Sequence, residues 1–357
     1  MSQISIEQLV QLVEDGERLV RLDLSGMDLS GQDLSGIHFD QVNMTGAKLD
    51  GINLWDSQLS NCVLTDASLL GANLKETNWS ACDLSGAVLE QGDLDNALFD
   101  HCNLTSVVLS AMSCKFAVFN SCCLKQISIA DSTLEITHFL DCILEQASMD
   151  RVHLDRVLIK EADLRTAQLG DIQCSTCVFM GCDFSGKNLS GRNFMGTQFT
   201  DAILTDVDFS SANLTRCNFK GAAIQGANLS GAQASQALFV ESAMQASKLD
   251  GADLTQAILV EAKLDLAFLR QANLYQCVFH KACCEATVFH GSELTYADFA
   301  YADLRRADLR QTTLMRTSFH GAVLDDVRWG DRSQALMNDP ELRDAELWSA
   351  DARGAEL

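Results

Sequence analysis

The sequence predicts an all-β protein, a four-sided β-helix built from five-residue repeats and preceded by a short helix. Three observations support this prediction. Every fifth residue from Leu24 to Trp329 is apolar, which makes 62 positions without a break. We call these apolar positions the centres of the repeats. A smaller residue stands two positions before most centres, and turn-forming residues follow them. Large aromatic residues recur at every fourth centre, which sets the number of sides.

A period of five residues fits neither the 3.6-residue turn of an α-helix nor the two-residue alternation of a simple strand. It fits a solenoid in which each repeat forms one short side and then turns a corner. The central residue and its small partner both point inward, because the interior is too narrow for two large side chains on each side. Ala47, Cys62 and Ala72 are examples of the small inward residue, and Asp or Asn often lies between the two inward positions. Turn formers such as Ser-Gly then follow.

These repeats resemble the pentapeptide repeat family, whose pattern is Ala-Asp/Asn-Leu-x-x. The strings "ANLSG", "GADLT" and "YADLRRADLRQ" reproduce that pattern almost literally, and the resemblance covers about residues 22–331. The resemblance implies a right-handed quadrilateral β-helix with four pentapeptides in each 20-residue coil. The chain would then form about 15.5 coils.

The phenylalanines indicate four sides independently of the resemblance. Reading every twentieth residue from Phe39 to Phe319 gives 15 positions, of which 11 are Phe. We call this line the Phe row and its side of the solenoid the Phe side. Three or five sides per coil would scatter these residues. A second line at the same spacing places cysteine at the small inward position, and stacked identical residues are typical of parallel in-register strands: Cys62, Cys82, Cys102, Cys122 and Cys142.

The sequence divides into an N-terminal helical cap at residues 1–21, the repeat β-helix at 22–331 and a C-terminal segment at 332–357. Residues 5–15 predict a helix, because Ser5 and Gln8 form a capping-box pattern ahead of one apolar face. Such a helix covers the open apolar end of the first coil, which a solenoid must hide.

Two structures are compatible with the C-terminal segment. Asp339-Pro340-Glu341 reads as an N-cap followed by proline in the first turn, which predicts a helix. The alternative is one further coil after a loop, because four residues are again five apart: Leu342, Leu347, Ala352 and Leu357.

Composition excludes several classes of protein. The net charge of −23 argues against direct binding of nucleic acid, which needs clustered Lys and Arg. No signal-peptide pattern opens the chain and no run of 18 apolar residues occurs, so we expect no membrane association. A bacterial cytoplasmic protein with free thiols is the expectation for 14 cysteines in so long a chain, with export by a dedicated secretion system as an alternative.

We expect no enzyme, no cofactor and no metal site. The seven histidines fall at outward positions, without the spacing of a catalytic triad or a metal site, and a regular solenoid has no deep cleft. Cys174 and Cys177 form a CxxC motif, ordinarily a redox or metal signal. Both positions point inward here, so we interpret the two thiols as small core residues.

Two cations break the inward pattern. Lys187 and Arg192 occupy the small inward position in the string "FSGKNLSGRNFMG". A cation there must reach outward along its stem or find buried acceptors. The two interpretations are a locally distorted coil and a site for an anion or a partner.

Acidic residues dominate the first four coils, residues 22–101, whose net charge is −11. This is close to the axial charge density of duplex DNA, about one charge per 1.7 Å. Some pentapeptide repeat proteins protect type II topoisomerases from drugs by imitating DNA, so the resemblance implies DNA gyrase or topoisomerase IV as an alternative partner. This chain is longer than those members and has no loop between its coils. The candidate acids are Asp40, Asp50, Asp56, Asp66, Glu76, Glu90, Asp95 and Asp100.

The outer surface of the Phe side supplies the second candidate site. The residues directly before and after the Phe-row centres face outward, and many of them are apolar. On the side centred at Leu34, which we call the polar side, the equivalent line from Asp33 to Thr313 holds no aliphatic residue. The apolar residues form either a contact surface for a protein or simple strand stacking. We call them the aliphatic row: Leu98, Val118, Leu140, Leu158, Val178, Met180, Leu238, Val240, Ile258, Val260 and Val278.

The sequence thus predicts a non-enzymatic rigid scaffold that binds a protein partner, or a second copy of itself, through one side of the solenoid. The resemblance implies two alternatives. One is a DNA mimic that acts on gyrase, and the other is a secretion-associated protein or delivered effector.

Overall fold

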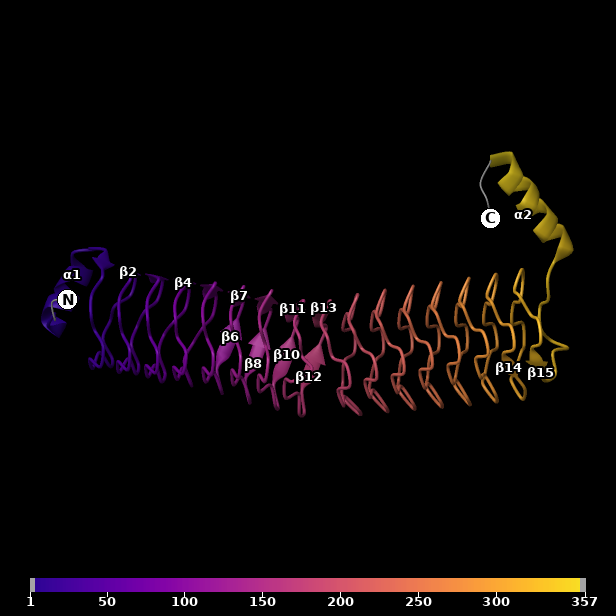
Figure 1. The fold of residues 1–357 in the computed structure, drawn as a ribbon, viewed down its shortest axis with the longest axis horizontal. Helices are drawn as coiled ribbons and strands as arrows, with labels where there is room; N and C mark the ends of the chain where they lie inside the picture. Colours follow the sequence, from indigo (N-terminus) through magenta and orange to yellow (C-terminus); the bar gives the residue numbers. More distant parts are fainter. Residues whose placement is uncertain (1–3, 354–357) are drawn as a thin grey trace. The chain divides into compact units, whose positions relative to one another are not determined.

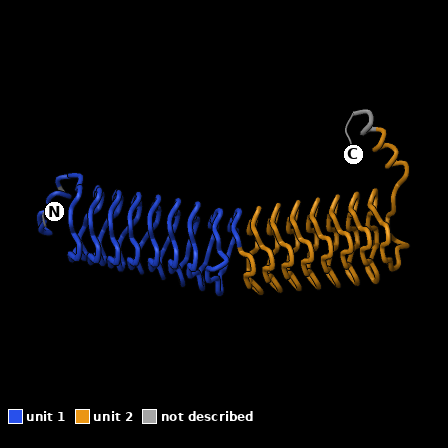
Figure 2. The backbone as a smooth tube through the Cα atoms, in the orientation of Figure 1, with its two compact units in different colours: residues 1–183 blue, residues 184–357 orange. Residues whose placement is uncertain are grey.

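The computed structural model describes residues 4–353 and divides the chain into two compact units, residues 1–183 and 184–357 (Figures 1 and 2). Each unit is a stack of coils joined by parallel backbone pairing. Residues 20 apart are partners, as in the pair Asn43 and Val63 of the first unit and the pair Asn213 and Gln233 of the second. The predicted β-solenoid with four five-residue sides per coil is therefore confirmed.

The first unit opens with helix α1, Ile6–Glu14, as the sequence predicts. The Ser5 side chain accepts a hydrogen bond from the Gln8 backbone N–H, and the Gln8 side-chain oxygen accepts one from the Ser5 backbone N–H, which completes the capping box. Leu9, on the apolar face of this helix, is fully buried. The first coil begins earlier than the apolar run suggests, because Leu19 is buried and pairs with Phe39.

Sheet formation in the first unit is concentrated on two sides. The Phe side forms a nine-stranded parallel sheet, and the neighbouring polar side forms a four-stranded one. The Phe-side strands are β1 (Leu19–Val20), β2 (His38–Asp40), β3 (Gln58–Ser60), β4 (Asn78–Ser80), β5 (Leu98–Asp100), β7 (Val118–Asn120), β9 (His138–Leu140), β11 (Leu158–Lys160) and β13 (Val178–Met180). The polar-side strands are β6 (Ser113–Lys115), β8 (Thr133–Glu135), β10 (His153–Asp155) and β12 (Gln173–Ser175).

The second unit uses mostly single bridges between coils, with two short paired strands near its end, β14 (Asp308–Leu309) and β15 (Arg328–Trp329). Beyond Trp329 the spacing of partners changes, because Ser318 pairs with Leu336, 18 residues on. Helix α2, Pro340–Arg353, then follows. Of the two alternatives for the C-terminal segment, the structure contains the helix, and Leu357 lies outside the described residues. No helix among residues 4–353 is long and apolar enough to cross a membrane.

Every corner of the coils needs a left-handed backbone. The residue two positions after each centre has a positive φ, at every fifth residue from Arg21 to Asp326 except Thr166. Glycine adopts this conformation without strain, as at Gly226 with φ 67°, whereas a β-branched residue such as Ile136, with φ 52°, does so at a cost. The Gly, Asn, Asp and Ser residues that follow the centres are therefore explained by corner geometry.

The core of each unit consists of the inward residues that the five-residue spacing predicts. All centres from Leu24 to Phe319 are buried. Rings of the Phe row stack face to face, with centroids 5.0 Å apart for Phe99 and Phe119 and 4.9 Å apart for Phe219 and Phe239. Such stacking combines a large buried apolar area with the ring spacing that parallel coils impose.

Candidate functional site

The first unit carries six residues of the aliphatic row on its Phe-side strands. Leu98 is paired with Val118, and Leu158 with Val178, so these side chains stack along the outer surface of the sheet. His138 stands between Val118 and Leu158 and interrupts the apolar line. Most of the row is half-buried by its own neighbours, and the side chain of Met180 is 40% exposed.

Two apolar residues at the adjoining corner were not predicted from the sequence. Phe116 is 45% exposed, and Ile136 lies at the same corner one coil further on. Both have a positive φ, of 59° and 52°, where Gly or Asn is usual. A bulky apolar residue at a corner position was the signal in the sequence that could have revealed them.

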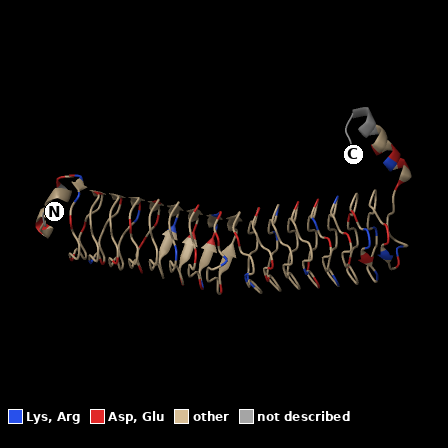
Figure 3. Cartoon of the chain, viewed as in Figure 1, with Lys and Arg blue, Asp and Glu red and all other residues tan. Residues whose placement is uncertain are grey.

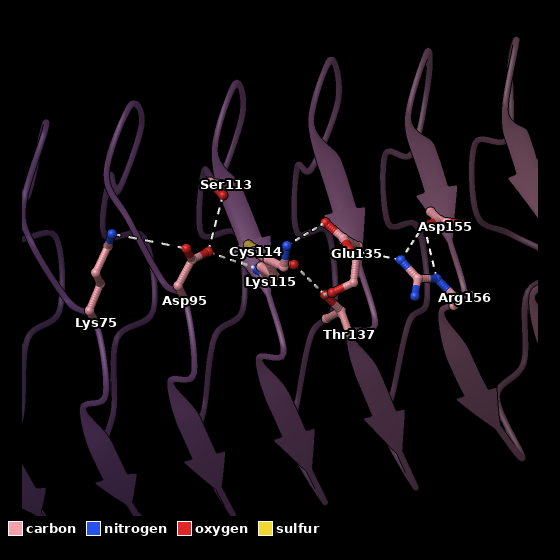
Figure 4. A network of polar contacts seen from close by, with 9 residues as sticks. All are labelled: Lys75, Asp95, Ser113, Cys114, Lys115, Glu135, Thr137, Asp155 and Arg156. Carbon is pink, nitrogen blue, oxygen red and sulfur yellow. Dashed lines mark hydrogen bonds and ion pairs between the residues drawn. The ribbon is translucent and has the colours of Figure 1, made fainter.

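A network of ion pairs borders this corner on the polar side of the first unit (Figure 4). The ammonium of Lys115 lies 3.0 Å from a carboxylate oxygen of Glu135 and 5.6 Å from the Phe116 ring centroid. Glu135 also binds Arg156 at 2.7 Å, and Arg156 binds Asp155 at 2.8 Å. An apolar strip beside a charged border resembles the apolar centre and polar rim of protein interfaces.

The second unit carries the other five residues of the aliphatic row. Leu238 bridges to Ile258, and Ile258 bridges to Val278. At the adjoining corner the rings of Tyr275 and Tyr296 meet edge to face with centroids 5.9 Å apart, and Tyr296 is 39% exposed. Tyrosine is enriched in protein interfaces because it combines apolar area with a polar tip.

The polar side keeps its contrast with the Phe side in both units. Its outward residues include Asn53 and Asn73 in the first unit, and Asn193 and Asn213 in the second. The side-chain amides within each pair are hydrogen bonded, at 2.8 Å and 2.9 Å. The aliphatic character of the Phe side is therefore not a general property of the coils.

The candidate acids of the first coils have two different roles. Five are half-buried, and four of these, Asp40, Asp50, Asp95 and Asp100, form hydrogen bonds to a neighbouring segment. Asp50 accepts a hydrogen bond from the Leu70 N–H at 3.0 Å, and Asp40 pairs with Arg18 at 3.1 Å. Bonds from Asn120 and His101 lower the pKa of Asp100. Three acids are exposed at corners: Asp56, Asp66 and Glu76.

Acidic and basic residues are spread along the coils of both units rather than confined to one (Figure 3). The predicted acidic end therefore holds structural carboxylates as well as exposed ones. A carboxylate that joins two coils is only partly available to imitate a phosphate.

The backbone at the two inward cations pairs with the following coil. Both Lys187 and Arg192 are half-buried. The Lys187 carbonyl accepts a hydrogen bond from the Asp208 N–H at 2.8 Å. The Arg192 carbonyl accepts one from the Asn213 N–H at 2.9 Å. The interpretation of a locally distorted coil stays a prediction for these residues. A site for an anion or partner at this position stays a prediction.

Twelve of the 14 cysteines are buried, while Cys123 is half-buried and Cys283 is exposed. Within the cysteine line, Cys122 donates its thiol hydrogen to the Phe99 carbonyl at 3.4 Å. The CxxC residues Cys174 and Cys177 both lie in the core, as predicted. Among the described residues no group of three His, Cys, Asp or Glu side chains could hold a metal ion.

We expect a thiol reagent to modify Cys283 rapidly and Cys123 more slowly in the native protein, with all 14 cysteines reacting only after denaturation. The thiolate is the reactive form, and burial raises the pKa of Cys114, Cys217 and Cys277 to about 12. Mass spectrometry of the labelled peptides identifies the sites. Rapid labelling of Cys174 or Cys177 would contradict their place in the core.

The family model for pentapeptide repeats matches more than half of the chain, at residues 23–57, 43–78, 82–112, 193–231, 217–256, 237–274 and 292–328. One similar structure is HetL from the cyanobacterium Nostoc sp. strain PCC 7120, a pentapeptide repeat protein involved in the regulation of heterocyst differentiation. It is 24% identical with a TM-score of 0.43, over 64% of this chain and 90% of HetL.

A second similar structure is full-length QnrB1, a plasmid-mediated fluoroquinolone resistance protein. It is 18% identical with a TM-score of 0.23, over 58% of this chain and 95% of QnrB1. No curated protein matches the sequence. The repeat pattern, the four-sided coils and the family match lead to one conclusion: the chain belongs to the pentapeptide repeat family.

Proposed function

We propose that this protein is a non-enzymatic scaffold that binds another protein through the outer surface of its Phe side. The observation that supports this most is the aliphatic row, which recurs in both units on one side, while the outward line before the polar-side centres, from Asp33 to Thr313, holds no aliphatic residue.

The size and setting of the row support the proposal. If each side chain offers about 40 Å², the six residues of the row in the first unit give about 240 Å² and the five in the second unit about 200 Å², each near the few hundred Å² at which exposed apolar surface marks an interaction site. Phe116 and Tyr296 enlarge it at the corners, with 45% and 39% of their surfaces exposed. The hydrogen-bonded coils within each unit hold these side chains in place before binding, which lowers the entropy cost of association.

The test replaces Val178 and Leu238 together with glutamate, one position in each unit. Neither side chain points into the core, so the variant should give the circular dichroism spectrum of the wild type. Two carboxylates on an apolar contact surface should reduce the amount of partner captured from a bacterial lysate at least about tenfold, because each must be desolvated. A matched control places glutamate at Gln173 and Gln233, exposed positions of the polar side.

The outcomes separate the proposal from its alternatives. A protein captured by the wild type and by the polar-side control, but lost from the Val178→Glu/Leu238→Glu variant, supports the proposal. Equal capture by all three proteins means that the row is strand stacking. Unfolding of the row variant would mean that these residues face inward.

The same capture experiment addresses DNA mimicry when gyrase and topoisomerase IV are probed explicitly. A third variant neutralises the three exposed acids, as Asp56→Asn, Asp66→Asn and Glu76→Gln. Because several other acids already bond to neighbouring segments, we expect this variant to capture as much partner as the wild type. Salt-sensitive binding of gyrase that this variant loses and the row variant keeps would establish DNA mimicry and overturn the proposal.

A further inference from the structure

The corner between the polar side and the Phe side of the second unit carries a ladder of glutamine side chains. Arg216 donates a hydrogen bond from Nε to Oε1 of Gln236 at 2.8 Å. Gln236 donates from Nε2 to Oε1 of Gln256 at 3.0 Å, and Gln256 donates in the same way to Gln276 at 2.9 Å. All four residues are exposed. One continuous chain of hydrogen bonds therefore crosses four successive coils on the surface.

Arg216 fixes the orientation of this glutamine ladder. A guanidinium can only donate, so the Gln236 oxygen must face it and each following amide points the same way. Gln236 and Gln256 each use one N–H and one oxygen lone pair within the ladder, and keep a second N–H and a second lone pair. Aligned hydrogen bonds polarise one another, which strengthens the remaining N–H donors. The ladder therefore offers a donor and an acceptor at successive coils, about 4.8 Å apart.

The surface that includes the ladder is almost uncharged. We call it the amide face: the residues one before, one after and two after each polar-side centre within residues 213–276, three in each of four coils. Only Arg216 and Asp253 among these 12 residues are charged. The same positions within residues 73–156 of the first unit hold eight charged residues in 15. The Asp253 carboxylate already accepts a hydrogen bond from the Thr255 N–H at 3.1 Å, so the amide face offers a ligand hydrogen bonds rather than charge.

Two tyrosines stand at the end of the ladder. Tyr275 belongs to the amide face, and Tyr296 takes the ladder position in the next coil. Their rings meet edge to face with centroids 5.9 Å apart, and Tyr296 is 39% exposed. A tyrosine ring combines an apolar face with a polar hydroxyl. The ladder thus ends on an aromatic surface that a flat apolar group can cover.

We propose that the amide face binds an extended chain of neutral sugars, a polysaccharide that lies along the coils of the second unit. Every sugar hydroxyl both donates and accepts hydrogen bonds, which matches the unused groups of the ladder. A sugar of an extended β-1,4-linked glucan is nearly as long as one coil step, so successive sugars meet successive glutamines. The C–H face of one sugar ring packs on Tyr296.

The charge of the chain favours a neutral ligand over a charged one. At −23 the protein repels anionic polysaccharides and nucleic acids. A cationic chain would need carboxylates, and Asp253 is the one carboxylate of the amide face. The amide face does not include the aliphatic row, so this inference does not rest on the proposed function.

The test is isothermal titration calorimetry of the full chain with cellohexaose and cellobiose. We expect cellohexaose to bind at least about tenfold more tightly than cellobiose, because it spans several glutamines while the entropy cost of association is met once. The Gln256→Gly and Tyr296→Gly variants should each bind cellohexaose at least about tenfold more weakly than the wild type. Both residues have a positive φ, of 59° and 61°, which glycine adopts without strain, so both variants should keep the wild-type circular dichroism spectrum.

Two controls locate the site. Gln271→Gly removes a glutamine from a different corner, at φ 54°, and should bind cellohexaose like the wild type. The Val178→Glu/Leu238→Glu variant should also bind it with wild-type affinity, whether or not that variant loses its protein partner. Failure of the wild type to bind cellohexaose at millimolar concentration overturns the proposal. Binding that Gln256→Gly and Tyr296→Gly retain in full, or that Gln271→Gly loses equally, overturns it as well, and so does tighter binding of the anionic hexagalacturonate.

Discussion

Replacing Phe219 with alanine is expected to lower the free energy of unfolding by about 3–5 kcal/mol. The ring is fully buried and stacks between Phe199, at 5.2 Å, and Phe239, at 4.9 Å. It also meets Phe209 edge to face at 6.2 Å. Removing it leaves a cavity in a narrow interior whose walls are held by coil-to-coil hydrogen bonds, so neighbouring side chains cannot collapse into the space.

Urea denaturation followed by circular dichroism measures this loss. The matched control is Gln198→Ala, an exposed outward position directly before a Phe-row centre, which should change stability by less than about 0.5 kcal/mol. A Phe219→Ala variant as stable as the control would show that the stacked rings of the Phe row do not stabilise the core of this unit.

Replacing Ala222 or its neighbour Ala223 with aspartate should have very different effects on the stability of the fold. Ala222 is a small inward residue with no exposed surface, so a carboxylate there is buried without a cation and should cost several kcal/mol or prevent folding. Ala223 is outward and half-buried, at the position where the repeat usually has Asp or Asn. At an equivalent position Asp83 accepts a hydrogen bond from the Ser85 N–H at 2.9 Å.

We therefore expect Ala222→Asp to be insoluble or to melt far below the wild type, while Ala223→Asp melts at the wild-type temperature or slightly above. Thermal unfolding of both variants in one buffer makes the comparison. Equal melting temperatures would mean that the assignment of inward and outward residues is wrong.

The coil geometry could be predicted from the sequence because every fifth residue must be apolar and buried. This requirement is the same at all centres, so the unusually small residues Ala234 and Cys284 do not hide the period. The ends were harder to predict. Leu19 was missed because it lies between a helix and the first repeat, and the five-residue spacing of Leu342 and Leu347 is equally compatible with a helix, which is what forms.

The surface could be predicted only in part, because exposure depends on what the neighbouring coil places beside a residue. The spacing correctly places Val118 and Leu158 outward, but each is half-buried by its stacked neighbours. It also identifies Asp50 as an outward acid, whereas its bonds to Ser68 and Leu70 become apparent only in three dimensions. Phe116 was not predicted as part of the apolar surface because the corner positions were interpreted only as turns.

Hydroxyl-radical footprinting of the wild-type protein, alone and bound to its captured partner, tests the central claim most directly. It reports side-chain exposure without any substitution. The scaffold proposal predicts that binding protects Met180 and Phe116, which are 40% and 45% exposed in the free protein, while Trp55 beside the acidic corner residue Asp56 stays reactive at its 46% exposure. Protection of Trp55 with no change at Met180 and Phe116 would contradict it.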